Sequence, residues 1–171
     1  MKELCLQDFS AIVGIDWADK KHDLCELSLS NGSSQHSVIS SKPEAVHDWA
    51  RDLRKRYPDK PVAVACELKK GPLVYALMKH AHIVIVPLHP ASVAKYRKTF
   101  QPSGAKSDPG DAWVQADMVY KHPDRFKALM PEAPEVRALS QLVEWRRKLV
   151  QDRVDLTNSI IWHLKNYYRS A

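Results

Sequence analysis

Two acidic residues follow apolar stretches of this 171-residue sequence, and together they could support metal-dependent chemistry. Asp16 follows the apolar residues 12–15, and Glu67 follows the apolar residues 62–66. Apolar runs of this length are typical of buried strands. A carboxylate at the end of such a strand costs desolvation free energy. It therefore usually has a partner, which is a cation, a group of hydrogen-bond donors or a metal ion.

Two more acids, Asp108 and Asp111, stand three residues apart at the start of a predicted helix. Both side chains can project from one helix face, about 5–6 Å apart. If the strands before Asp16 and Glu67 are neighbours, a helix start over that sheet edge completes a four-carboxylate cluster. Such a cluster repels itself unless divalent cations neutralise it, and oxygen ligands without His or Cys select Mg²⁺ or Mn²⁺. Two such ions about 4 Å apart can catalyse phosphodiester chemistry.

Each acid also has a simpler interpretation. Asp16 could be a turn residue that caps a hairpin, and Glu67 could pair with Lys69 or Lys70. Asp108 could be the N-cap of its helix, with a proline at the first helical position and the second acid in the first turn. Taken together these interpretations are less satisfactory, because two independent apolar strands both end in an acid.

The elements that must position these acids follow from hydropathy patterns and from turn residues. A strand, a helix and a strand within about 25 residues, starting at residue 62, form a βαβ unit, which predicts parallel pairing and a right-handed crossover. The sequence therefore predicts an α/β fold. We expect strands at residues 11–16, 22–29, 36–40, 62–66 and 83–86, and helices at 43–57, 73–80, 91–100 and 112–121.

The last part of the sequence has a different character. Residues 135–168 contain neither Gly nor Pro and carry apolar residues at roughly heptad spacing. The preceding part is too small for so long a helix to lie against, which favours a coiled-coil or partner helix over a core helix. Arg146 and Arg147 interrupt the apolar stripe and weaken a strict two-stranded interpretation. We expect an α/β domain over residues 1–130 and a long pairing helix over residues 131–171.

Composition limits the class of protein. The formal charge of +6 is compatible with a polyanionic partner, and equally with a slightly basic globular protein. Three cysteines, with no C-x-x-C spacing, predict buried free thiols at Cys25 and Cys66 in a reducing cytoplasm. No apolar run approaches the roughly 20 residues of a membrane span, and the amino terminus lacks a signal-peptide core. We expect a cytoplasmic protein.

Basic residues near the acids could bind a nucleic-acid backbone, and the interleaved Tyr96 and Phe100 could stack on bases. A solvated helix face is the alternative interpretation of this basic segment. A milder basic patch lies on the long helix. The candidates for nucleic-acid contact are Lys69, Lys70, Lys95, Arg97, Lys98, Lys106, Arg146 and Arg147.

Four motifs in a fixed order resemble a known family. They are Gly14-Ile15-Asp16, Cys66-Glu67, Val86-Pro87-Leu88-His89-Pro90 and Lys106-Ser107-Asp108-Pro109-Gly110-Asp111-Ala112. This set resembles the amino-terminal RuvC-like domain of the DEDD insertion-sequence transposases, also called bridge-RNA-guided recombinases, of which the pilin-gene invertase is a relative. The resemblance covers nearly the whole chain from Ile12.

The resemblance implies a ribonuclease-H-like fold, with a mixed five-stranded sheet, helices on both faces and a long coiled-coil helix after it. It implies an Mg²⁺- or Mn²⁺-binding tetrad of Asp16, Glu67, Asp108 and Asp111. It also implies an enzyme that cuts and rejoins DNA at sites specified by a non-coding RNA, with a long helix that serves dimerisation and RNA contact.

The sequence departs from the family pattern in two ways. Lys69-Lys70-Gly71 follows Glu67, where the family tends to carry a small residue and then glycine. The family's second domain, which bears a nucleophilic serine, does not follow the long helix. We therefore expect a fragment that is inactive on its own.

Two other functions are compatible with these features. The first is a non-catalytic RNA-binding and dimerisation module on the same fold. The second is a phosphotransferase of the actin-like ATPase fold, which also begins with a strand ending in Gly-Ile-Asp. The turn after Asp16 lacks the Gly- and Thr-rich phosphate cradle of those enzymes, which argues against the second alternative.

Overall fold

The computed structural model describes residues 4–100, 108–130 and 132–168, except for the side chains of residues 108 and 109. The chain divides into two compact units, Met1–Met130 and Pro131–Ala171, which are described separately below. The first is called the sheet unit. The second consists mainly of one helix, α5.

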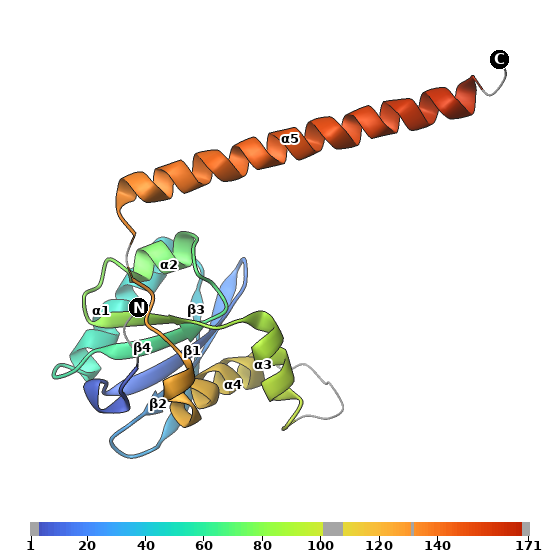
Figure 1. Cartoon of the computed structure of the whole chain (residues 1–171). Helices are drawn as coiled ribbons and strands as arrows, with labels where there is room; N and C mark the ends of the chain where they lie inside the picture. The colour runs from blue at the N-terminus through green and yellow to red at the C-terminus, as the bar shows by residue number, and fades with distance from the viewer. Residues whose placement is uncertain (1–3, 101–107, 131, 169–171) are drawn as a thin grey trace. The chain divides into compact units, whose positions relative to one another are not determined.

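The sheet unit contains a five-stranded mixed sheet in the order β3-β2-β1-β4-β5 (Figure 1). β1 pairs antiparallel with β2, and β2 pairs antiparallel with β3. β4 pairs in parallel with β5, as the βαβ pattern predicted, and it also pairs in parallel with β1. The strands are β1 (Ala11–Trp17), β2 (Lys21–Ser28), β3 (Ser34–Ser40), β4 (Val62–Cys66) and β5 (Ile83–Pro87).

Four α-helices connect and cover these strands: α1 (Pro43–Arg56), α2 (Pro72–Leu77), α3 (Pro90–Arg97) and α4 (Asp108–Lys121). Short 3-10 helices lie at Leu6–Asp8 and Pro123–Arg125. Proline occupies the first turn of α1, α2 and α3, where its missing N–H costs no hydrogen bond. The α3 helix ends at Arg97, earlier than the predicted residue 100.

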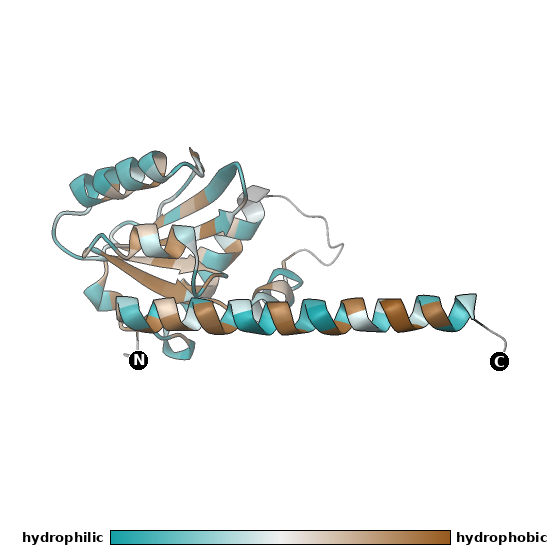
Figure 2. Cartoon of the chain, turned by 90° about the horizontal axis from the view of Figure 1, so that it is seen from above, coloured by the Kyte–Doolittle hydropathy of each residue, from teal (hydrophilic) through white to brown (hydrophobic). Residues whose placement is uncertain are grey.

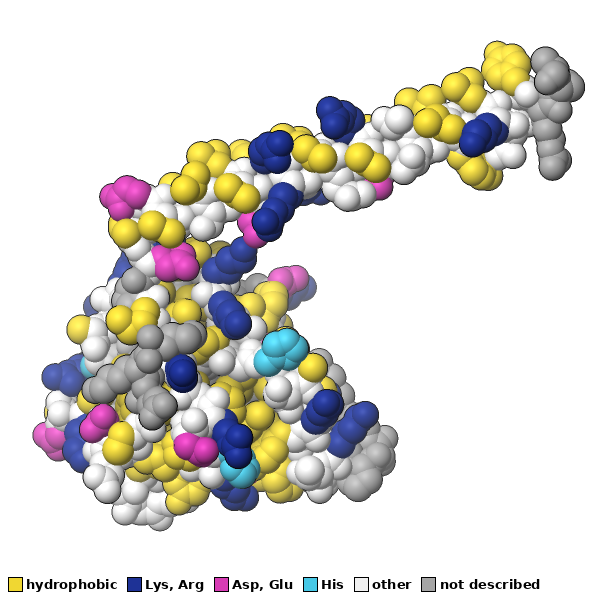
Figure 3. Space-filling model, in the orientation of Figure 1, with side chains coloured by type: hydrophobic (Ala, Val, Ile, Leu, Met, Phe, Trp, Pro, Cys, Tyr) yellow, Lys and Arg dark blue, Asp and Glu magenta, His cyan; other side chains and the backbone are white. Residues whose placement is uncertain are grey.

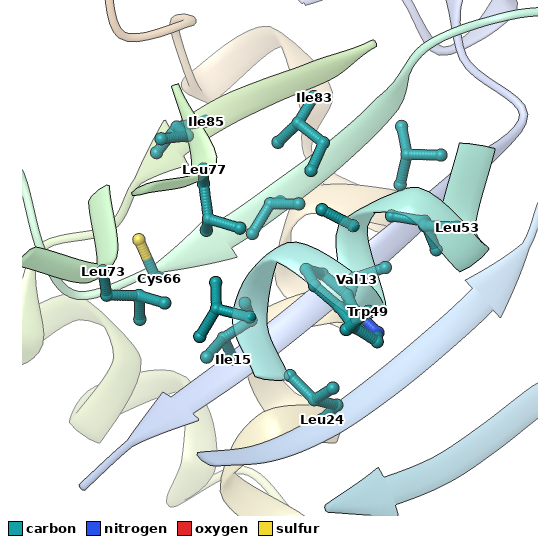
Figure 4. Packing of buried hydrophobic residues seen from close by; sticks show 14 of the residues in the cluster. Val13, Ile15, Leu24, Trp49, Leu53, Cys66, Leu73, Leu77, Ile83 and Ile85 are labelled. Atoms are coloured by element: carbon teal, nitrogen blue, oxygen red, sulfur yellow. The ribbon is translucent and has the colours of Figure 1, made fainter. Parts of the chain in front are cut away.

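One face of the sheet packs against α1 and α2 (Figure 4). Val13 and Ile15 of β1 contribute to this core, together with Trp49 and Leu53 of α1 and Leu77 of α2. The apolar strands at the centre of the sheet stand out in Figure 2. β4 is buried at every position, as its unbroken apolar run predicted.

The opposite face packs against α3 and α4. Its core combines Ile12 and Ala63 from the strands with Val93 of α3 and with Val114 and Val119 of α4. Helices therefore lie on both faces of a mixed five-stranded sheet. This confirms the predicted α/β class, and the strand arrangement is consistent with the ribonuclease-H-like fold.

The thiols are free, as predicted. Cys25 and Cys66 are buried, whereas Cys5 is exposed. Burial raises the pKa of the Cys66 thiol to about 11, so this residue behaves as a small apolar side chain in the core.

The α5 helix (Pro134–Tyr167) is 34 residues long and has no buried residue. Apolar side chains follow one another along its length, with basic side chains between them (Figure 3). Pairing of this helix with a second copy stays a prediction. No helix in the described ranges is long and apolar enough to cross a bilayer.

Candidate functional site

Asp16 and Glu67 leave the sheet at the same edge. β1 and β4 are parallel neighbours, with Ile15 opposite Cys66. Asp16 and Glu67 are the next residues along the two strands, and both side chains are half-buried. The structure thus confirms that the two acid-ending strands are adjacent, on which the four-acid prediction depended.

Strand alternation directs both acids toward the face that α4 covers. Ile12 lies in the core beneath α4, and side chains two residues apart on a strand share a face, so Asp16 belongs to that face. Ala63 and Ala65 of β4 lie in the same core, and Glu67 continues their alternation. The two carboxylates therefore emerge on the α4 side of the edge.

Gly14 brings the start of α4 directly onto β1. A Cβ atom at this position would overlap the Ala112 carbonyl oxygen and lie 2.8 Å from the Ala116 amide nitrogen. Only glycine allows this approach of two backbones. Asp108 and Asp111 stand in the first turn of α4, just before Ala112. The fold therefore places the helix start near the edge that carries Asp16.

Gln115 links α4 to both β1 and β4 through hydrogen bonds. Its side chain is almost completely buried. With the amide oriented to satisfy its hydrogen bonds, the side-chain nitrogen donates to the carbonyl oxygens of Ile15 (2.9 Å) and Ala65 (3.1 Å). Sequence reasoning missed this residue. The only signal was a single amide among the apolar residues of the helix.

Asp111 forms an ion pair within the site. Arg97 Nη1 donates to Asp111 Oδ1 over 2.6 Å, with the Asp111 side chain 9% exposed and that of Arg97 30% exposed. The guanidinium compensates the desolvation cost of this buried carboxylate. Arg97 was predicted to contact nucleic acid, and the structure gives it a contact with a predicted tetrad residue.

A second polar contact joins α3 to α4. The Tyr96 hydroxyl donates to Asp117 Oδ2 (2.8 Å), and Lys121 Nζ lies 3.3 Å from Asp117 Oδ1. Burial and this hydrogen bond raise the pKa of Tyr96 to about 12, so the phenol remains a donor. Base stacking by Tyr96 stays a prediction, and the structure shows that its hydroxyl forms a hydrogen bond to α4.

A further acid lies beside Asp16, one of the predicted four. Asp23 of β2 stands directly opposite Asp16 in the antiparallel pair and is buried. Lys21 Nζ lies 3.4 Å from Asp23 Oδ2 and offsets the repulsion between two facing carboxylates. Asp23 was not identified from the sequence, because it falls inside an alternating strand rather than at a strand end.

The other predicted basic residues are dispersed. Lys69, Lys70, Lys95 and Lys98 are exposed on the sheet unit, and Lys106 lies outside the described residues. Arg146 and Arg147 are exposed on α5. Figure 3 shows Lys and Arg side chains scattered over the visible face rather than gathered in one patch.

The donor set suits a hard divalent cation, since each of the four predicted ligands is a carboxylate. Among the side chains that the structure describes, no three acids, histidines or cysteines are grouped closely enough to hold a metal ion. The side chain of Asp108, one of the four, is outside that set.

The mixed sheet with helices on both faces, two acids at one sheet edge and a helix start nearby is consistent with the ribonuclease-H-like fold class. Residues 13–169 match the model of the IS110 family of DEDD transposases, described as transposase. The chain belongs to this transposase family.

The chain is 29% identical over 161 residues to a Streptomyces coelicolor protein that bears the name of a mini-circle transposase for IS117. The match covers 92% of this chain and 38% of the relative. The chain therefore spans about two fifths of that relative's length.

Proposed function

We propose that the sheet unit is the metal-dependent catalytic domain of a DNA transposase that cuts and rejoins strands, at sites chosen by a non-coding RNA. The observation that carries this proposal is the shared sheet edge of Asp16 and Glu67, with the first turn of α4 held there through Gly14. Membership of the transposase family supports the choice of DNA as substrate.

Asp16, Glu67, Asp108 and Asp111 would hold Mg²⁺ or Mn²⁺. Such ions, when bound, activate a nucleophilic oxygen and stabilise the leaving oxygen of a phosphodiester. The chain's own contribution is position. Pairing of β1 with β4 fixes the first two acids relative to each other, and α4 carries the other two.

Arg97 acts in this proposal as a positioning residue. Its hydrogen bond to Asp111 holds the side chain of this buried acid in one orientation. The side chains of Lys69, Lys70, Lys95 and Lys98 are exposed, and in this proposal they contact the phosphate backbone. Arg146 and Arg147 extend the basic character to α5.

The two units have separate roles in this proposal. The sheet unit is the catalytic domain, and α5, within residues 131–171, pairs with a second copy as a coiled coil and contacts RNA. The exposed apolar residues of α5 support pairing, since a helix with an apolar stripe gains stability when another helix covers it.

The test compares Asp16→Asn and Asp111→Asn with Asp59→Asn, an exposed acid just before β4, at the opposite edge of the sheet. In the complete transposase we expect the first two variants to lose about a thousandfold or more in strand cleavage, because several kcal/mol of charge stabilisation is lost. We expect Asp59→Asn to cleave normally. Calorimetric titration of this chain with Mn²⁺ should show weaker metal binding by Asp16→Asn and Asp111→Asn, and unchanged binding by Asp59→Asn.

Unchanged cleavage by Asp16→Asn would remove the tetrad assignment. A different result would favour the non-catalytic alternative: binding of structured RNA that survives loss of all four acids, with no cleavage by the unsubstituted protein. Both results can be obtained from the same set of variants.

A further inference from the structure

A cavity of about 530 Å³ lies on the other side of the sheet edge that carries the acids. The connection between β1 and β2, the start of α1 and the segment from Leu68 through α2 enclose it. Its volume is within the range of about 300–1,000 Å³ that small-molecule sites occupy. All of its lining residues belong to the sheet unit.

Trp17 connects this cavity to the candidate site. It is the last residue of β1, directly after Asp16, so strand alternation directs it to the opposite face. Its side chain is 45% exposed, an uncommon state for so large an aromatic group. It pairs across the hairpin with His22, which is buried and also lines the cavity.

The lining combines three kinds of chemistry. Val46, Leu68 and Leu73 are apolar, Trp17 and Tyr75 are flat aromatic groups, and Lys70 and Lys79 are exposed cations. Asp19 is the acid among the lining residues, so the charged groups carry a net positive charge. A ligand with a flat apolar ring and an attached negative charge matches this set.

We propose that the cavity holds one unpaired base of the DNA strand whose phosphate meets the acids, with Trp17 stacked on the base and Lys70 and Lys79 facing the sugar-phosphate. This proposal rests on the proposed function. One nucleotide carries a phosphate and a base side by side, just as β1 carries Asp16 and Trp17 in succession. Stacking on an aromatic side chain recognises any base, and an enzyme that displaces a base from its stack needs such a receiving site.

The experiment measures binding of the present chain to two single-stranded probes by fluorescence anisotropy. One probe is a thymidine pentanucleotide, and the other is a pentamer of abasic deoxyribose phosphate. We expect Trp17→Ala to weaken binding of the thymidine probe about tenfold and to leave the abasic probe unchanged, because only the first probe can stack. Trp17→Phe should retain most of the affinity.

Matched variants separate stacking from charge. Trp162→Ala removes an exposed tryptophan of α5 and should leave both probes unchanged. Lys70→Ala and Lys79→Ala should weaken both probes alike, because the backbone is common to the two. Circular dichroism of each variant establishes that the fold is retained.

Three results would overturn the proposal. They are equal losses on both probes with Trp17→Ala, no loss on either probe, or, when a uridine pentaribonucleotide is measured as a third probe, a loss with that probe alone, which would assign the cavity to RNA. The Asp16→Asn variant keeps this test independent, because the Trp17 effect should persist in that background. Cleavage by Asp16→Asn would refute the proposed function and leave the cavity result intact.

Discussion

The sheet unit buries its apolar residues, whereas α5 leaves the same kinds of residue exposed. In the sheet unit, leucines such as Leu53 and Leu77 are completely buried, whereas Leu142 of α5 is 63% exposed. The sheet unit covers its apolar residues with its own two helical layers. A periodic pattern of apolar residues therefore predicts a buried core only where another element of the same chain packs against those residues.

The largest expected difference between the two units concerns burial. Leu53→Ala should lower the free energy of unfolding of the sheet unit by about 3 kcal/mol, because it removes buried methyl groups and leaves a cavity. Leu142→Ala should change that free energy by less than about 0.5 kcal/mol. Hydrogen exchange of the β1 and β4 amides, measured at increasing urea concentration, gives the change in the free energy of unfolding for both variants.

The same leucine pair tests the pairing of α5. Sedimentation should show weaker self-association for Leu142→Ala and normal self-association for Leu53→Ala at temperatures where it is folded. Equal self-association in the two variants would contradict the proposed coiled coil.

A smaller difference is expected between a buried and an exposed ion pair. Arg97→Gln should lower the free energy of unfolding of the sheet unit by about 2 kcal/mol, since it leaves the buried Asp111 carboxylate without its cation. Lys148→Gln breaks a pair with Asp152 on α5, whose side chains are at least half exposed, and should cost less than about 0.5 kcal/mol. Equal costs in urea unfolding would show that Arg97 and Asp111 are not paired in solution.

The smallest difference concerns pH. Burial lowers the pKa of His22, whose Nδ1 accepts a hydrogen bond from the Ala18 amide. Because the folded state favours neutral His22, the free energy of unfolding should fall as the pH drops below about 6.5, where the histidine protonates in the unfolded chain.

Paired unfolding measurements at pH 7.5 and 5.5 test this expectation. His22→Gln should reduce the drop, by at most the roughly 1.4 kcal/mol that one proton can contribute over one pH unit, because glutamine accepts the same bond without titrating. His163→Gln, on the exposed surface of α5, should leave the drop as it is in the unsubstituted chain. Identical drops in all three proteins would exclude His22 as the cause.

Most of the fold could be predicted because its elements have strong local signals. Unbroken apolar runs identified β4 and β5, and the short βαβ spacing gave their parallel pairing. That the strands ending in Asp16 and Glu67 are neighbours was only a condition of the four-acid prediction, and the structure meets that condition. The predictions of β4, β5 and their parallel pairing needed only the hydropathy pattern, the length of each apolar run and the length of the connection between them.

The contacts that complete the candidate site have no comparable local signal. Arg97 and Asp111 are 14 residues apart on different helices, so their pairing depends on how α3 and α4 pack. Gln115 carries an amide that would ordinarily be exposed, yet it reaches two strand carbonyls. The position of Trp17 at the wall of a cavity depends on α1 and α2, which supply other residues of that wall. Such contacts are determined by tertiary packing rather than by periodicity.

The backbone contact at Gly14 sets a limit on how this domain can vary. The core around β1 consists of apolar side chains, and cores accept exchanges among such residues when total volume is kept. Gly14 has no such freedom, because any side chain there would displace α4 from β1 and move the first turn of that helix away from the sheet edge. A library that randomises the core around β1 should therefore return many residues at Ile12 and Val13, and glycine alone at position 14.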